Sequence, residues 1–172
     1  MWWPELRLAR AAALLVALLA LGACQVRPLY APAPGEAGPQ ADLPAIAVDQ
    51  PVSREEQAYR NALLFALQGG GGSDTARFTL AFRLTIREQE ILVERNTGIP
   101  NAYQLTGAVS FLLRDAGSGA SLFGAQVNAV DSYTRSSQNF ANIRARRDAE
   151  DRLAKTLAEL TSARLAAYFA TH

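Results

Sequence analysis

The residue best suited to chemistry in this sequence is Cys24, the only cysteine in the chain. It follows an apolar run over residues 11–23, which is preceded by the basic residues Arg7 and Arg10. This run is too short to cross a bilayer as a helix, which takes about 20 apolar residues. It does match the hydrophobic region of a secretory signal peptide, which spans roughly 7–15 residues and ends in small residues. We therefore predict a signal peptide over residues 1–23.

The four residues Leu21-Gly22-Ala23-Cys24 resemble the lipobox of bacterial lipoproteins, in which a small pair precedes a cysteine whose thiol receives a diacylglycerol. The small pair lets a peptidase approach an extended backbone, and a thiol is nucleophilic enough to form the thioether. We expect cleavage between Ala23 and Cys24 and a covalent lipid on Cys24, with no other cofactor. The alternatives are an ordinary signal peptide with a chance cysteine and an uncleaved signal anchor.

Composition bounds the rest of the chain. Without residues 1–23 the sequence has 149 residues (172 − 23), a length typical of one domain. Hydrophobic residues make up 49% of the full chain, which is enough for a packed core. The 17 basic and 16 acidic residues include Arg7, Arg10 and Glu5, so 15 of each sign remain. A neutral domain has no field that attracts nucleic acid, and we predict no nucleic-acid partner.

Side chains suited to catalysis are scarce. A single cysteine cannot form an internal disulfide, and the only histidine, His172, is the last residue of the sequence. The chain therefore has no internal example of the commonest general base and metal ligand. It also has no Gly-x-Ser-x-Gly element, the nucleophile elbow of many hydrolases. We predict no enzyme activity, no catalytic residue and no metal site, with carboxylate-only catalysis as the alternative.

Residues 24–41 are predicted to be a lipidated N-terminus and a flexible tether, because residues 31–40 are rich in Pro, Gly and Ala and have too little apolar bulk to fold alone. A single domain is predicted over residues 42–172. It begins with a short strand over residues 43–49, where Pro44 indicates a strand start or an edge.

A helix is predicted after this strand. Ser53 occupies an N-cap position with Glu56 three residues later, and apolar residues then recur at intervals of three and four up to Gln68. The glycine run 69–72 stops the helix. We interpret this run as a flexible connector rather than a phosphate-binding loop, because it follows a helix and lacks a lysine.

Three strands are predicted next, joined as a meander. Residues 78–87 alternate strictly between apolar and polar, which indicates one buried and one polar face. Residues 96–101 form a longer turn, and residues 116–119 a hairpin turn. The second strand has an apolar face and a polar face, and the third runs from Leu122 to Tyr133. The apolar face of the second strand consists of Leu105, Val109, Phe111 and Leu113, against Thr106, Ser110 and Arg114.

A long helix is predicted at the end of the chain, capped by Ser136 or Ser137. Its predicted apolar line is Ile143, Leu153, Leu157, Leu160 and Tyr168. On its outer face, charges four residues apart are expected to pair, each pair contributing about 0.2–0.5 kcal/mol, which is typical of a solvated helix. The expected pairs are Arg144–Asp148, Arg146–Glu150, Arg147–Asp151 and Asp151–Lys155.

The predicted fold class is therefore α+β, with the order β-α-β-β-β-α. Two amphipathic helices and a half-buried sheet are most simply combined by packing both helices on one face of a four-stranded, mostly antiparallel sheet. The other face carries Thr, Ser, Arg and small residues, and is free to meet a partner or water.

Two passages resemble a known family. Cys24-Gln25-Val26-Arg27-Pro28-Leu29-Tyr30 resembles the C-G-F-x-P-L-Y opening of the lipopolysaccharide-assembly lipoproteins, LptE, of alphaproteobacteria, with Gln25 and Val26 in place of the more usual Gly and Phe. Residues 132–142 and 144–150 are similar to the passage from the last strand to the last helix of that family. With the order of strands and helices, the resemblance spans nearly the whole mature chain.

The resemblance implies a role without catalysis. LptE-like proteins lie at the outer membrane, insert into the lumen of the β-barrel LptD, and act as its plug and assembly factor in lipopolysaccharide export. It also implies a heterodimer with an LptD-like barrel and a lipid anchor on the periplasmic side of the outer membrane. Gln25 is compatible with this location, since Asp after the cysteine resembles an inner-membrane retention signal in enterobacterial lipoproteins.

Some members of the family are reported to bind lipopolysaccharide directly, which requires Arg or Lys against its phosphates. The candidate contacts here are Arg83, Arg87 and Arg114 on polar strand faces and Arg95 at a turn. The alternative for these four residues is that they are ordinary surface or barrel-facing residues. An alternative for the whole protein is a periplasm-facing auxiliary lipoprotein of an ABC-type lipid transport system, and a lipid-anchored hydrolase is a third reading.

Replacing the thiol tests the predicted anchor. Cys24→Ser should abolish acyl labelling and leave the uncleaved precursor, because a hydroxyl cannot form the thioether. Radiolabelled fatty acid incorporation and the mass of the chain measure both effects. Normal processing of the variant would contradict the lipobox interpretation.

Overall fold

The computed structural model describes residues 42–69, 76–93 and 100–171. A single 3-10 turn, η1 (Leu43–Ala45), leads into β1 (Ile46–Val48), and the remaining elements follow in the order α3 (Arg54–Gln68), β2 (Phe78–Val93), β3 (Pro100–Asp115), β4 (Ser121–Thr134) and α4 (Asn139–Phe169). The predicted signal peptide, its cleavage point and the tether lie outside the described residues. So do most of the predicted glycine connector and of the first strand-to-strand turn.

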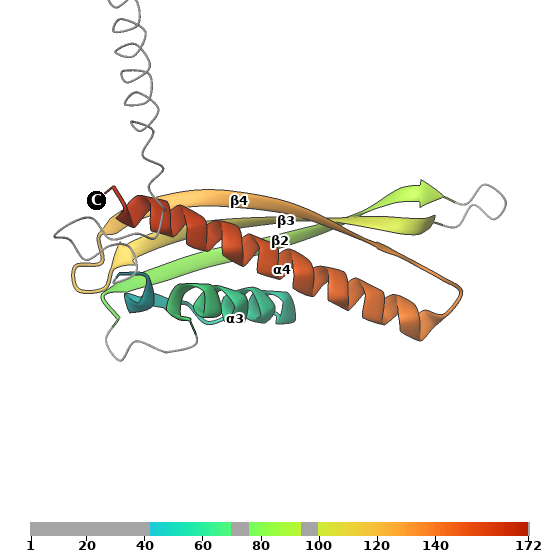
Figure 1. Ribbon diagram of the computed structural model, residues 1–172, viewed down its shortest axis with the longest axis horizontal. Helices are drawn as coiled ribbons and strands as arrows, with labels where there is room; N and C mark the ends of the chain where they lie inside the picture. The colour runs from blue at the N-terminus through green and yellow to red at the C-terminus, as the bar shows by residue number, and fades with distance from the viewer. Residues whose placement is uncertain (1–41, 70–75, 94–99, 172) are drawn as a thin grey trace, which may run out of the picture.

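The strands form one sheet in the order β1-β2-β3-β4. β1 runs parallel to β2, and the other two neighbouring pairs are antiparallel. In Figure 1, β2, β3 and β4 run the length of the molecule, and α3 and α4 lie beside each other. The predicted α+β class and the mostly antiparallel sheet are confirmed.

Both helices pack on the same face of the sheet. The ring of Tyr59 on α3 lies 5.0 Å from that of Phe82 on β2, and the ring of Tyr168 on α4 lies 5.0 Å from that of Phe123 on β4. Phe82 and Phe123 point to one face, because each lies directly opposite a buried residue of β3. Phe82 is opposite Phe111, and Phe123 is opposite Leu113. This face is the core, and it confirms the predicted placement of both helices.

α3 begins and ends at the predicted residues. The Ser53 side chain accepts a hydrogen bond from the Glu56 N–H at 3.2 Å, and the Glu56 carboxylate accepts one from the Val52 N–H at 2.9 Å. The first bond satisfies an N–H group that the first helical turn leaves free, and the second holds the chain just before the helix. Gly69 ends the helix with a φ of 59°, a left-handed conformation that is costly for side chains with a Cβ.

The three long strands keep the predicted alternation. Leu80, Leu105, Val109 and Leu113 are buried, while Thr106, Ser110 and Arg114 are exposed on the opposite face. β2 continues beyond the predicted end at residue 87 to Val93, and β3 begins at Pro100, so the hairpin is longer than its apolar pattern indicates. The predicted strand over residues 43–49 shrinks to Ile46–Val48, since Pro44 lies in a 3-10 turn.

The last helix differs from the prediction at two points. Its N-cap is Gln138, whose side chain makes no capping bond, so neither Ser136 nor Ser137 caps it. Instead the Asn142 side chain accepts a hydrogen bond from the Ser136 N–H at 2.7 Å and donates one to the Ser136 carbonyl at 2.8 Å. The segment that leads into α4 is therefore held by the side chain of Asn142, which lies within the helix.

The buried side of α4 is also different. Leu153 and Leu157 are buried as predicted, but Ile143 and Leu160 are 51% and 40% exposed. The core side is completed by small residues that the predicted apolar line omitted: Ala149, Ala154, Ala158, Thr161, Ser162 and Ala166. Small side chains let α4 approach both α3 and the sheet. They form its buried side together with Leu153, Leu157 and Leu165, and Ile143 and Leu160 lie outside it.

Two contacts place α4 closely against its neighbours. The buried Tyr59 hydroxyl hydrogen-bonds the Thr161 side chain at 3.0 Å across the two helices, and burial raises the pKa of Tyr59 to about 12. On the sheet side, a Cβ placed on Gly107 would lie 2.8 Å from Leu157 Cδ1 and 3.1 Å from the Leu153 side chain. A larger residue at Gly107 would therefore force the leucine side chains of α4 to shift where the helix crosses β3.

Filling this contact should destabilise the protein. We expect Gly107→Val to lower the free energy of unfolding by about 1–3 kcal/mol, because it overpacks a closed core. Denaturant unfolding followed by circular dichroism measures the change. Gly117→Val is the matched control, since the space at that turn glycine is open apart from an Asp115 oxygen at 3.5 Å, and it should change stability little. Equal effects of the two variants would contradict the packing argument.

Candidate functional site

The polar face of the sheet carries the three described arginines that the sequence singled out. Arg83 and Arg87 lie on β2. Arg114 lies on β3 opposite Thr79, and Thr79 is four residues before Arg83 on β2. Successive arginines are thus about 13 Å apart along the sheet, at a rise of roughly 3.3 Å per residue. All three are exposed, so the structure brings them into one row. Arg95 lies outside the described residues.

The charge of this face has one sign. The outward positions are the odd-numbered residues 79–89 of β2 and the even-numbered residues of β3 and β4. Within the described chain, those positions hold the three arginines and no Asp or Glu. Glu88 and Asp131 belong to the opposite face, where arginines from α4 hold them. The polar face is therefore suited to a ligand or partner with negative charge.

Arg83 also borders a shallow hollow of about 280 Å³. The hollow is lined by Ala81, Phe82, Arg83, Ser110, Phe111 and Leu112. A guanidinium and a serine hydroxyl are both hydrogen-bond donors, and Arg can bind a phosphate or a carboxylate through two parallel hydrogen bonds, in a bidentate manner. The aliphatic Leu112 beside them adds an apolar contact. This arrangement can bind an anion, but it contains no nucleophile paired with a base.

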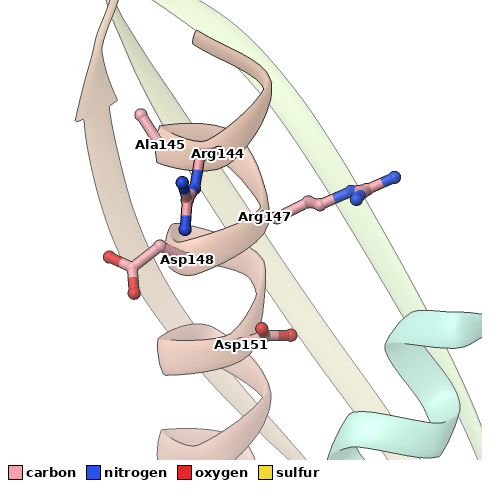
Figure 2. A pocket seen from close by; sticks show the side chains of 5 residues that line it. All are labelled: Arg144, Ala145, Arg147, Asp148 and Asp151. Atoms are coloured by element: carbon pink, nitrogen blue, oxygen red, sulfur yellow. The ribbon is translucent and has the colours of Figure 1, made fainter. Parts of the chain in front are cut away.

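A second hollow, of about 520 Å³, lies beside the first turns of α4. Figure 2 shows its lining residues Arg144, Ala145, Arg147, Asp148 and Asp151, with α3 close to its far end. The two acids are already bonded elsewhere: Asp148 pairs with Arg152, and Asp151 pairs with Arg54 at 2.9 Å. In the part of the chain that the structure describes, no ion pair involves Arg144 or Arg147.

These pairs correct the predicted pattern along α4. Of the four expected pairs, only Arg146–Glu150 forms, at 3.1 Å. Among the described residues, three expected pairs do not form: Arg144–Asp148, Arg147–Asp151 and Asp151–Lys155. Asp148 is paired with Arg152 instead, and Asp151 with Arg54. Arg54 also bonds Glu150 at 2.7 Å, so it ties the start of α3 to α4.

A third cluster joins the far half of the sheet to α4. Tyr133 donates a hydrogen bond to Glu88, which also pairs with Arg146 at 3.1 Å. Burial raises the pKa of Tyr133 to about 12, and the Glu88 carboxylate adds to the rise, so the phenol stays protonated and remains a donor. Tyr103 stacks on Tyr133 at 5.3 Å, and Arg135 donates to the Tyr103 hydroxyl at 3.1 Å. The cluster is fully bonded and holds the strands and helix together.

Sequence reasoning missed this cluster and the Arg54 contacts. The partners are separated by 45 residues for Tyr133 and Glu88 and by 96 for Arg54 and Glu150. No local spacing indicates such pairs. Cys24 lies outside the described residues, so its predicted lipidation stays a prediction.

Two further properties concern the described part of the chain. Residues 42–69, 76–93 and 100–171 contain no group of His, Cys, Asp and Glu side chains that could hold a metal ion. None of the helices in these ranges is both long enough and apolar enough to cross a membrane.

Comparison with known proteins identifies the family. The family model described as LptE, lipopolysaccharide-assembly, matches residues 43–165, which covers most of the folded domain. The chain belongs to the LptE family. No curated protein sequence matches it. Family membership makes the chain a lipopolysaccharide-assembly protein of the cell envelope, a class without known catalysis.

Solved structures agree with this assignment. A candidate lipoprotein from Caulobacter crescentus CB15 is similar with a TM-score of 0.65 and 25% identity, over 78% of this chain and 97% of that one. The minor lipoprotein from Acinetobacter baumannii has a TM-score of 0.54 and 17% identity, over 71% of this chain and 90% of that one, and it supports the fold.

Proposed function

We propose that this LptE-family protein is the plug and assembly factor of an LptD-like β-barrel, with which it forms a heterodimer at the outer membrane and helps to place lipopolysaccharide in the outer leaflet. The observation that carries the proposal is the family match over residues 43–165. Residues 1–23 are then the signal peptide, and Cys24 bears the lipid. Residues 24–41 are the tether from the periplasmic side of the membrane to the domain at residues 42–172.

The shape and surface of the domain support a role inside a barrel. Large outer-membrane barrels have polar interiors, so a plug must present polar surface to the wall. The sheet has one face covered by both helices and one face that carries Thr, Ser, Gln, Asn and Arg side chains. Long strands and a 31-residue helix give the molecule an elongated form, as Figure 1 shows.

We also propose direct contact with lipopolysaccharide through Arg83, Arg87 and Arg114, with Arg95 as a further contact. The described three form a row on a face without acidic side chains, and Arg83 borders a hollow that also contains the Ser110 hydroxyl. Guanidinium groups bind phosphates by charge-assisted hydrogen bonds, which contribute about 1.5–3 kcal/mol each when well formed.

Purification from membranes tests the partner. The tagged full-length chain should co-purify with a large β-barrel from the outer membrane, and its depletion should reduce surface lipopolysaccharide. Membrane fractionation, mass spectrometry of the eluate and surface labelling of lipopolysaccharide are the measurements. Recovery with the inner membrane and without a barrel would overturn the proposal and favour the auxiliary role in an ABC-type lipid transport system.

Paired substitutions test the arginine row. Arg83→Gln with Arg87→Gln should weaken binding of fluorescent lipopolysaccharide by about tenfold or more, since loss of about 1.4 kcal/mol changes affinity tenfold. Arg144→Gln with Arg147→Gln removes the same charge from exposed positions on α4 and should leave binding nearly unchanged. Equal losses in the two variants would show a non-specific charge effect and contradict the proposed contact.

A further inference from the structure

Among the described residues, β4 forms one of the two open edges of the sheet, and β2 beyond its short pairing with β1 forms the other. The Arg135 N–H bonds the Asn101 carbonyl of β3, so the odd-numbered residues of β4 direct their backbone groups to β3. The backbone groups of Ser132 point the other way, away from β3. Its N–H bonds Asp131 Oδ1 at 2.6 Å, and its carbonyl accepts a bond from Arg152 at 3.2 Å. The even-numbered residues 124–130 therefore point their N–H and C=O groups away from the sheet.

This edge lacks the usual protection against pairing. Free edges are normally guarded by Lys, Arg or Pro, by inward charges or by covering segments. The open part of β2, beyond β1, carries Arg83, Arg87, Glu88 and Glu90. β4 has no Lys, Arg or Pro between Ser121 and Thr134, and its single charge, Asp131, is bonded to Arg152. Within the described chain, no backbone group bonds the edge from 124 to 130.

The side of α4 next to this edge carries small and apolar residues with two exposed charged residues, Glu159 and Arg164, beside them. Arg152 reaches the Ser132 carbonyl, so the stripe of α4 that contains Arg152 faces the β4 edge. Residues 156, 160, 163 and 167 continue that stripe at helical spacing. They are Thr156, Leu160, Ala163 and Ala167, of which Leu160 is 40% exposed. The open strand edge and the small and apolar residues at the centre of this helix flank thus form one continuous surface.

We propose that this surface pairs with the same surface of a second copy of the chain. The two β4 strands would run antiparallel about a two-fold axis at Gln126, which joins the two sheets into one. Gln126 then lies opposite itself, Gly124 opposite Asn128, and Leu122 opposite Val130. These are even-numbered residues on both copies, so their outward backbone groups from 124 to 128 meet in hydrogen-bonded pairs.

Side chains select this register. Leu122 and Val130 are exposed, at 38% and 57%, and lie four residues on either side of Gln126, so each covers the other across the axis. The core side then pairs Phe123 with Ala129. Moving the axis to Val127 would place Phe123 against the charged Asp131 and leave Val130 opposite Gly124. The pairing also ends before Ser132, whose backbone groups are already bonded.

The helix layer fits the same axis. Leu157 lies over Gly107, which pairs with Ala129, and Tyr168 stacks on Phe123. Gln126 is midway between Ala129 and Phe123, so the turn of α4 above it is the one that contains Leu160 and Ala163. Two strands occupy about 10 Å of sheet, and packed helices lie about 8–10 Å apart. The two α4 helices would therefore meet side by side at Leu160 and Ala163.

A two-fold arrangement of this kind is self-complementary, because one patch covers its own copy. It closes the open edge and buries the three exposed apolar residues on this side of the molecule. The inference does not rest on the proposed function, since it concerns the chain before or apart from any barrel partner. It assigns a homodimer interface to the β4 edge.

Disulfide trapping tests the interface in the full-length protein purified in detergent and separated from any barrel partner. Gln126→Cys should yield a disulfide-linked dimer after mild oxidation, because Cα atoms of such a pair lie about 5.5 Å apart, within the range of a disulfide. Non-reducing electrophoresis with detection of a tag reports the dimer. The parental chain controls for Cys24, and Ser110→Cys is the matched position, exposed on the same face and directly opposite Gln126 but one strand further in.

A second substitution separates the interface from chance collisions. Leu160→Glu added to Gln126→Cys should abolish the cross-link, whereas Phe65→Glu, at a 71% exposed apolar residue of α3, should leave it unchanged. Both sites are exposed, so both variants should fold. Absence of the Gln126→Cys dimer or equal cross-linking at Ser110→Cys would each overturn the proposal.

Discussion

The close approach of α4 to β3 at Gly107 governs the arrangement of this protein. Without a side chain at Gly107, Leu153 and Leu157 descend onto the strand, and Thr161 comes within hydrogen-bonding distance of Tyr59 on α3. The two helices can then share one face of the sheet. A sheet in this arrangement buries only that face, and the other must be polar. The separation of a core face and a polar face follows directly from the packing of α4.

The distribution of charge follows from the same arrangement. Glu88 and Asp131 face the helices and are held there by Arg146 and Arg152. The positions of these acids in the strands place them on the helix side, and the opposite face carries its arginines without acidic neighbours. Burial alone would raise the pKa of Asp131, but bonds from Arg152 and the Ser132 N–H lower it below its ordinary value, so the acid stays ionised. The positive polar face of this LptE-family protein thus lies opposite a core face whose two acids are paired.

The two open edges of the sheet differ for a physical reason. β2 runs past the three-residue β1, so a long part of its edge is free, and charged side chains on it oppose the approach of another strand. On β4 only the end at Ser132 is closed, by Asp131 and Arg152. An edge with free backbone groups and few charged side chains is a template for pairing with another strand, and this difference marks the β4 edge as the proposed interface.

Much of the fold follows from local sequence patterns. The alternation over residues 78–87, the cap at Ser53 and the stop at Gly69 each depend on neighbouring residues, so they could be predicted without a tertiary structure. The arginine row follows too, since Arg83 and Arg87 differ by an even number of residues on one strand. The family resemblance could also be found from the sequence, and the match over residues 43–165 confirms it.

Other features were decided only by the tertiary structure. The buried side of α4 passes through alanines rather than Ile143 and Leu160, because neighbouring elements approach closest where side chains are small. Three of the four predicted ion pairs along α4 give way to Arg54 and Arg152, which reach the same aspartates. A pair four residues apart contributes only about 0.2–0.5 kcal/mol, so a better-placed partner displaces it. For Asp151 that partner is Arg54, from another helix, and for Asp148 it is Arg152, which is also four residues away but on the other side along α4. Contacts between distant segments depend on the packed geometry, and no local pattern encodes them.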